Sequence, residues 1–400
     1  MSKLSENKWT RAAIPALLIH CSIGTVYCWS LLKTDIALYT GYSKASVEWA
    51  FSLAIFMLGM SAAFGGKIIE KDIHKSSLIS ALFFAIGFIG TGFFVYIKSL
   101  PGIFLTYGII MGIGLGFGYL APVKTLMLWF SKQKGLATGI AVAGFGLAKV
   151  IASPIMNYLL KTQGIVRLFY ILGVVYFISM YLGHLLLKKP EGWVESADQQ
   201  KGKIVKKIFK NPLFWGIWTI FFINITCGLA LISQEKDILA VMSVPAVTIA
   251  LVSSLSAAFN AFGRLGFASL GDKLKDRNSI YKIIFLLSAL FSIAAFASNS
   301  ITAKLVFLVV SLFCVINAGY GGGFSNLPTL LSDRFGMEAI SQIHGLTLTA
   351  WAIAGIAGNQ LSSFILTVSG SFSMVLLVIA ILYILALIIA MFLPKQKSLV

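Results

Sequence analysis

The chain has 400 residues, of which 58% are hydrophobic and only 12% are charged. This composition excludes a soluble domain, because soluble chains are about 45 to 50% apolar and about 25% charged. The formal net charge of +18 does not indicate nucleic-acid binding, because the basic residues are dispersed among loops and form no stripe beside aromatic side chains. The sequence therefore predicts a helical membrane protein with many spans.

Apolar runs recur along almost the whole chain, each close to the ~20 residues that cross a hydrocarbon core about 30 Å thick. In chain order they predict twelve spanning helices, at residues 12–33, 46–66, 77–97, 102–129, 136–158, 166–187, 212–233, 246–270, 280–299, 303–327, 343–367 and 371–393. The long polar segment 188–211 is predicted as a cytoplasmic linker. The predicted domains are a six-helix bundle over residues 1–187, this linker, and a second six-helix bundle over residues 212–400.

The lysines and arginines between the spans predict the orientation. Most of them fall on the same side as the N-terminus, which begins with Lys3, Lys8 and Arg11. Since loops rich in Lys and Arg stay in the cytoplasm, both termini are predicted to be cytoplasmic. The first apolar run is too long for a cleavable signal and is interpreted as a spanning helix. The predicted location is a cell membrane, either a bacterial inner membrane or an equivalent plasma membrane, with the chain crossing the lipid bilayer many times.

One arginine lies deep in the eighth predicted span. Arg264 stands in an apolar stretch, with no Asp or Glu within a helical turn. An Arg near the centre of a membrane helix costs roughly 2.5 to 3.5 kcal/mol, so such a residue typically faces a protein interior or a wet cavity. Asp272 lies eight residues further on, about 12 Å along the helix, which makes an extension of Arg264 to the cytoplasmic surface the less favoured alternative. A guanidinium binds a carboxylate through two parallel hydrogen bonds, so the sequence predicts an anion site.

The two halves of the chain repeat weakly. Gly66–Lys71 after the second span and Leu270–Lys273 after the eighth are both glycine-containing turns with an acid followed by a base. Internal repeats are typical of carriers in which one bundle rocks against the other about a midplane site. With two groups of six spans and these turns, the chain resembles the major facilitator superfamily.

Further motifs narrow the resemblance to the group of oxalate/formate antiporters and monocarboxylate carriers. These motifs are Gly24–Ser30, Trp129–Phe130, Lys134–Gly139, Ala143–Gly146, Asn211–Trp215, Gly321–Phe324, Leu327–Pro328, Ala350–Trp351 and Ala354–Gly355. The resemblance implies an all-α membrane protein with twelve transmembrane helices in two pseudo-symmetric six-helix bundles, the major facilitator fold. It also implies that the first, fourth, seventh and tenth spans line the cavity, and that Arg264 is the arginine that anchors the substrate.

The candidate substrate contacts are Arg264, Tyr119, Tyr320, Asn260, Lys149, Trp351, Tyr27 and Asn224. Asn260 lies one turn before Arg264 on the same helix face, where it can orient the guanidinium without neutralising it. Lys149 either extends the site toward a dicarboxylate or reaches past its neighbours to water, and Lys124 is expected to reach water near the end of its span. Trp351 stands where the resemblance implies a lysine in oxalate-selective members, which favours a monocarboxylate with an apolar tail.

Coupling and gating candidates come from titratable residues and from the repeated turns. No Asp or Glu lies in the middle of a predicted span, so proton symport and anion exchange both remain open. His20 and His344 can titrate near neutral pH and are proton-coupling candidates, with a buried structural role as the alternative for each. The candidate gating residues are Glu70, Lys71, Asp272, Lys273, Gly321 and Gly322, the glycines because they make their helix deformable.

The predicted function is secondary active transport of a small organic anion, a monocarboxylate such as lactate or pyruvate, by alternating access with proton symport. The alternatives are an antiporter that exchanges a dicarboxylate for a monocarboxylate, as for oxalate and formate, and an exporter of an anionic amphiphile. An enzyme is not expected, because the sequence offers no catalytic triad, paired acids or metal-ligand cluster at usable depth. We expect no cofactor, no metal, no nucleic acid and no obligate protein partner. A receptor or scaffold without transport activity is disfavoured by a short linker that contains no recognisable module.

Overall fold

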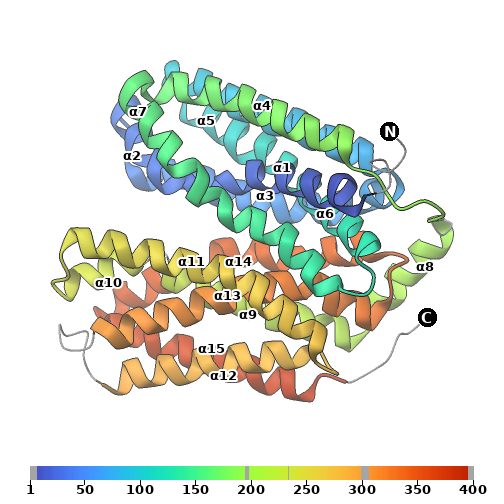
Figure 1. The fold of residues 1–400 in the computed structure, drawn as a ribbon. Coiled ribbons are helices and arrows are strands. Elements are labelled where there is room, and N and C mark those ends of the chain that lie inside the picture. The colour runs from blue at the N-terminus through green and yellow to red at the C-terminus, as the bar shows by residue number, and fades with distance from the viewer. Residues whose placement is uncertain (1–6, 194–197, 233, 299–305, 395–400) are drawn as a thin grey trace. The chain divides into compact units, whose positions relative to one another are not determined.

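The computed structural model describes residues 7–193, 198–232, 234–298 and 306–394, and the regular structure in these ranges is helical (Figure 1). Contacts between Cα atoms divide the chain into two compact units. Unit 1 consists of residues 1–205 and 336–352, and unit 2 consists of residues 206–335 and 353–400. The predicted bundle boundaries at 187 and 212 stay a prediction.

Unit 1 contains the helices of the first half of the chain. They are α1 (Ile14–Ile23), α2 (Trp29–Thr40), α3 (Lys44–Lys71), α4 (Ile73–Tyr96), α5 (Leu100–Ile103), α6 (Gly112–Trp129) and α7 (Lys134–Leu186). α1 and α2 are joined by the 3-10 helix η3 (Gly24–Cys28), and α5 and α6 by the π-helix η4 (Phe104–Met111), so each pair forms one apolar segment. Within this unit α7 packs against α1 and α4, and α6 packs against α3 (Figure 1).

Eleven helical segments in the described ranges are long and apolar enough to cross a membrane, and one of them contains two predicted spans. α7 runs for 53 residues and is bent at Gly164, which has a φ of +74°. Side chains disfavour a positive φ, so glycine suits a sharp change of direction. This bend falls between the predicted spans 136–158 and 166–187, and the order of the other spans is as predicted.

Polar residues at the edges of the apolar runs begin several helices. Ser43, Asp72, Ser99 and Ser371 each accept a hydrogen bond from a backbone N–H in the first turn of the following helix. Such bonds satisfy donors that have no partner inside the helix. They fix the start of each helix at the polar border of its apolar run.

Unit 2 contains the helices of the second half. They are α9 (Pro212–Ile232), α10 (Glu235–Val241), α11 (Ala246–Lys273), α12 (Asn278–Ala297), α13 (Val306–Phe335) and α15 (Phe372–Phe392). α14 (Ile340–Ser369) contributes its first part to unit 1 and its second part to unit 2. α11 packs along α13, and α12 packs against α13 and α15.

Small residues allow α11 and α13 to approach closely. A Cβ atom added to Gly321 would collide with the carbonyl oxygen of Asn260, and one added to Gly263 would collide with the backbone of Ala318. Contacts of this kind permit close packing of helices in lipid, where the attraction is mainly van der Waals. The packing fixes which residues of α13 face the arginine on α11.

The predicted linker is partly helical. α8 (Asp198–Phe209) lies within it and carries Lys206 and Lys207 in its last turn. α10 forms in the short segment between the seventh and eighth predicted spans.

Candidate functional site

Arg264 is buried on α11, with 1% of its surface exposed. Its Nε donates a hydrogen bond of 2.9 Å to Oδ1 of Asn260, one helical turn earlier. Its guanidinium carbon lies 5.4 Å from the ring centre of Phe324 on α13, within the range of a cation–π interaction. Both of these partners are uncharged, so neither neutralises the guanidinium. The side chain therefore does not extend to the surface, and Asn260 holds it from the predicted face of the helix.

Tyr320 lies on α13, and Asn224 on α9 packs against that helix. Tyr320 is 2% exposed and packs on Phe324, with 5.1 Å between the ring centres. Asn224 on α9 is fully buried and donates a 3.2 Å hydrogen bond from Nδ2 to the carbonyl oxygen of Gly319. Among the residues that the structure describes, Oδ1 of Asn224 has no hydrogen-bond donor. Tyr320 thus shares the aromatic neighbour of Arg264, whereas Asn224 binds the backbone of α13 at Gly319.

Five predicted site residues lie together in unit 1, where four of them meet the ring of Phe145 and His344 meets the ring of Tyr119. The aromatic cluster consists of His20, Tyr27, Tyr119, His344 and Trp351 together with Phe145. The ring of Tyr119 stacks on His20 at 5.4 Å and meets Trp351 at 5.7 Å and His344 at 5.8 Å. Each aromatic pair stabilises by about 0.5 to 1.5 kcal/mol beyond the burial of its area. The cluster is therefore a rigid, mainly apolar arrangement that carries two imidazoles.

His20 lies between two backbone carbonyl groups. Its Nδ1 is 2.6 Å from the oxygen of Ala141, and its Nε2 is 3.1 Å from the oxygen of Tyr119. A neutral imidazole has one N–H, whereas an imidazolium has two. Only the protonated ring can therefore donate a hydrogen bond to both oxygens. In the neutral ring, one of the two nitrogens has no hydrogen to donate to the carbonyl oxygen that it faces.

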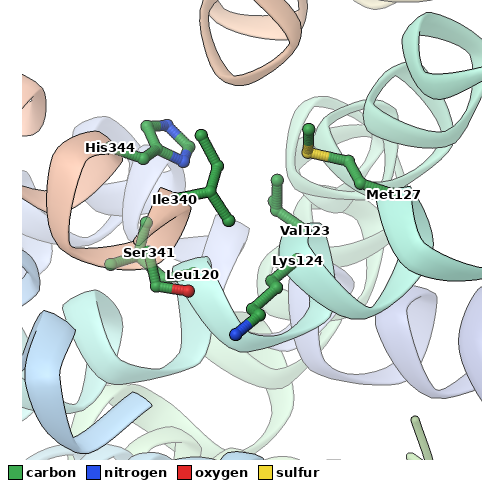
Figure 2. A pocket seen from close by; sticks show the side chains of 7 residues that line it. All are labelled: Leu120, Val123, Lys124, Met127, Ile340, Ser341 and His344. Atoms are coloured by element: carbon green, nitrogen blue, oxygen red, sulfur yellow. The ribbon is translucent and has the colours of Figure 1, made fainter. Parts of the chain in front are cut away.

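A narrow cavity with too little room for a water molecule lies in unit 1 between α6 and the first part of α14 (Figure 2). The residues that line it are Leu120, Val123, Lys124, Met127, Ile340, Ser341 and His344. Lys124 is 2% exposed, so the prediction that it reaches water is wrong. His344 is also 2% exposed, and within the described part of the chain its Nε2 has no hydrogen-bond partner. The cavity thus combines an ammonium, a hydroxyl and an imidazole.

Lys149 is half-buried on α7 and close enough to Cys28 for an electrostatic interaction. A half-buried position does not decide between an extension of the substrate site and a lysine that reaches water, so both interpretations stay predictions. Of the predicted substrate residues, Arg264 and Tyr320 meet Phe324 in unit 2, and three others, Tyr27, Tyr119 and Trp351, meet Phe145 in unit 1.

The described gating candidates include an acid in an ion pair, two exposed lysines and two glycines inside a helix. Asp272 pairs with Arg277, with 2.7 Å between Oδ1 and Nη2, and Arg277 also pairs with Asp333 at 3.1 Å. Lys71 and Lys273 are exposed at the ends of their helices, and Glu70 lies outside the described side chains. Gly321 and Gly322 lie inside the continuous helix α13, packed against α11. Their gating roles stay predictions.

Sequence reasoning missed three functional candidates. Arg277 is the ionic partner of Asp272, Lys124 lines the cavity, and Glu235 is a buried acid on α10. The recurrence of Ser256, Asn260 and Arg264 every four residues on α11 was a signal for a polar stripe that leads away from the arginine. In the described ranges, His, Cys, Asp and Glu form no group of three that could hold a metal ion.

Known carriers resemble the chain over most of its length. An uncharacterised MFS-type transporter, YhjX, of Escherichia coli is 26% identical and aligns with 89% of this chain and 87% of its own length. The oxalate:formate antiporter of Oxalobacter formigenes is 26% identical over 91% of this chain and 86% of its own. Apicoplast pyruvate carrier 1 of Toxoplasma gondii is 24% identical over 90% and 82%.

Solved structures show the same fold. A bacterial homologue of the iron transporter ferroportin in its outward-facing state aligns with a TM-score of 0.76 over 96% of this chain and 98% of its own, at 13% identity. The transporter FucP in the outward conformation aligns with a TM-score of 0.69 over the same shares, also at 13% identity. The family model of the Major Facilitator Superfamily matches residues 16–359. Because this match covers most of the chain and the helices adopt the corresponding fold, the protein is a multi-pass membrane transporter that belongs to the Major Facilitator Superfamily.

Proposed function

We propose that this transporter carries a small monocarboxylate, such as lactate or pyruvate, by alternating access together with a proton. The observation that carries the proposal is Arg264, a buried guanidinium whose Nε is held by the neutral amide of Asn260 and whose plane lies near Phe324. In a surrounding of low dielectric constant, an anion is the partner that gains most from such a group. Arginine also presents the planar fork that fits a carboxylate.

The mainly apolar aromatic cluster in unit 1 supports a monocarboxylate as the substrate. Trp351 is 1% exposed and packs on Tyr119 and Phe145. By the resemblance, oxalate-selective members carry a lysine at this position, and an indole gives no counter-charge to a second carboxylate. The names of two relatives specify oxalate with formate and pyruvate, which supports a small carboxylate as the class of cargo.

Anion exchange is the second candidate mechanism. The buried Lys124 beside His344 adds positive charge to unit 1. In anion exchange this charge is compensated during both crossings, because the carrier binds an anion on its way in and another on its way out. An exported anionic amphiphile is a weaker alternative, because the cavity at Lys124 is narrow.

Uptake into proteoliposomes tests the proposal and separates the two mechanisms. Purified protein is supplied with radiolabelled lactate under an imposed proton gradient, and separately with preloaded counter-anion and no gradient. We expect gradient-driven uptake, and we expect Arg264→Lys to lower it at least about tenfold, because an ammonium cannot form the two parallel bonds.

Arg167→Lys is the matched control, because Arg167 is an exposed arginine on α7. It should leave uptake unchanged. Full uptake by both Arg264→Lys and Arg264→Ala would rule out Arg264 as the anion site. Uptake that needs counter-anion and ignores the proton gradient would favour exchange.

A further inference from the structure

A buried carboxylic side chain lies on the short helix α10 of unit 2. Glu235 is 5% exposed. The hydroxyl oxygen of Ser256 on α11 lies 2.9 Å from Oε1 and 3.0 Å from Oε2 of this carboxyl group. Burial disfavours a carboxylate much more than a neutral carboxylic acid. Protonation of Glu235 therefore removes a large part of the free-energy cost of burying this side chain.

The Ser256 hydroxyl can serve both protonation states of Glu235. It donates its hydrogen to the carboxylate, and its oxygen can accept a hydrogen from the protonated acid. Neither state requires the side chains to move apart. Such a pair suits a group that gains and loses a proton during each cycle.

A polar stripe on α11 connects this pair with the anion site. Ser256, Asn260 and Arg264 follow one another at intervals of four residues and so share a helix face. Asn260 accepts the hydrogen bond from Nε of Arg264 at 2.9 Å. Ser256 and Arg264 are eight residues apart, about 12 Å along the helix. At an effective dielectric constant of about 20, a unit charge at that distance changes the affinity for an anion by about tenfold.

Several charged or titratable groups of the described chain lie on the helices next to Glu235. On α10, Lys236 and Asp237 are exposed. On α11, no charged residue precedes Arg264. From α13, the Cys314 thiol lies close enough to interact electrostatically with Glu235. Thiols ordinarily ionise near pH 8.5, so this group stays neutral through most of the physiological range.

We propose that Glu235 is the proton-binding site of this transporter and that its protonation strengthens anion binding at Arg264. The inference rests on the proposed function of proton-linked monocarboxylate transport. On the side of entry, a proton from water forms an O–H bond with a carboxylate oxygen of Glu235, and the negative charge is removed from the polar stripe. On the side of release this bond breaks, the proton returns to water, and the restored carboxylate weakens anion binding. Proton and anion thus favour each other's binding, as symport requires.

Glu235→Gln tests the inference, because the amide imitates the protonated acid in size and cannot release a proton. We expect gradient-driven lactate uptake to fall at least tenfold. We expect exchange of internal for external lactate at equal pH to stay within about twofold of the wild type, since exchange needs no net proton movement. Asp237→Asn, which removes an exposed acid from the same helix, is the matched control and should change neither assay.

The outcomes separate this inference from the proposed function. If the wild type shows neither proton-driven uptake nor exchange of monocarboxylates, the proposed function fails. If a proton gradient drives lactate uptake both in the wild type and in Glu235→Gln, only the present inference fails. Loss of both uptake and exchange in a variant that elutes as folded protein also contradicts it, because Glu235 would then be needed for translocation itself.

Ser256→Ala provides a second test that keeps the carboxyl group. Removing the donor disfavours the carboxylate, so the proton is held more tightly and the pH of half-maximal uptake should rise by about one unit. An unchanged pH profile would overturn the inference, including in the case that Glu235→Gln does not fold.

Discussion

At the scale of single residues, two buried polar side chains, Arg264 and His20, lie against neutral groups. Arg264 is held by an amide and an aromatic ring, and His20 lies between two backbone carbonyl groups. A neutral hydrogen-bond partner fixes geometry while it preserves charge, whereas an ion pair would cancel it. The amide of Asn260 and the ring of Phe324 therefore fix the guanidinium of Arg264 without cancelling its charge.

Asn260→Asp tests this interpretation at the same position. The new carboxylate would lie one turn from Arg264 and compete with the substrate for the guanidinium, so the affinity for lactate should fall at least about tenfold, or ~1.4 kcal/mol. The measurement is the substrate-induced rise in the melting temperature of purified protein, which depends on the dissociation constant.

Asn260→Ala is the control for loss of the hydrogen bond alone. It should weaken binding less than the aspartate does, because it adds no negative charge. Equal affinity in Asn260→Asp and the wild type would show that Arg264 does not contact the anion.

At the scale of elements, local polar residues decide where the helices begin. Asp72 ends α3 and begins α4, where its Oδ1 accepts hydrogen bonds from the N–H groups of His74 at 2.9 Å and Lys75 at 3.0 Å. These bonds favour the charged carboxylate, and the bond from Lys75 is the main cause of the lowered pKa of Asp72. The cap therefore depends on the pH.

Asp72→Ala should lower the free energy of unfolding by about 1 kcal/mol at neutral pH, the usual value of an N-cap. Because the folded state lowers the pKa of Asp72, this stabilisation is fully present above the ordinary value of 3.8 and is lost as the pH falls through the folded-state value. Thermal unfolding in detergent at a series of pH values measures the difference, which should disappear in acid.

Glu191→Ala is the control, because Glu191 is exposed and forms a weak 3.8 Å contact with Lys188. Its unfolding should match the wild type at every pH. A penalty for Asp72→Ala that persists undiminished in acid would contradict the cap as its origin.

At the scale of the whole molecule, the distribution of charge predicts how the chain crosses the bilayer. Lysines and arginines gather in the segments on the side of the N-terminus, so we propose that both termini face the cytoplasm. Alkaline phosphatase fused after Lys98, between α4 and α5, should be active, because that segment is predicted to be external. The same reporter fused after Val400 should be inactive, and a fluorescent protein there should fold. The reversed pattern would show the opposite orientation.

The order of the spans, the all-helical fold and the burial of Arg264 could be read from the sequence. Each depends on hydropathy over about 20 neighbouring residues, or on the penalty for one charge in such a run, and both are local properties of the chain. The position of Asn260 beside Arg264 was predictable for the same reason, because four residues make about one helical turn.

Only the tertiary structure decided which polar residues are buried and which residues meet. In the sequence, Lys124 and Glu235 lie near the ends of predicted spans. Lys124 is buried beside residues of α14, and Glu235 is buried where α10 packs on α11. Tyr119 and Trp351 are far apart in the sequence, yet their rings touch, and Asp272 pairs with an arginine beyond its own helix. Hydropathy is averaged along the chain, whereas burial and pairing depend on segments brought together from distant positions, so no local pattern contains them.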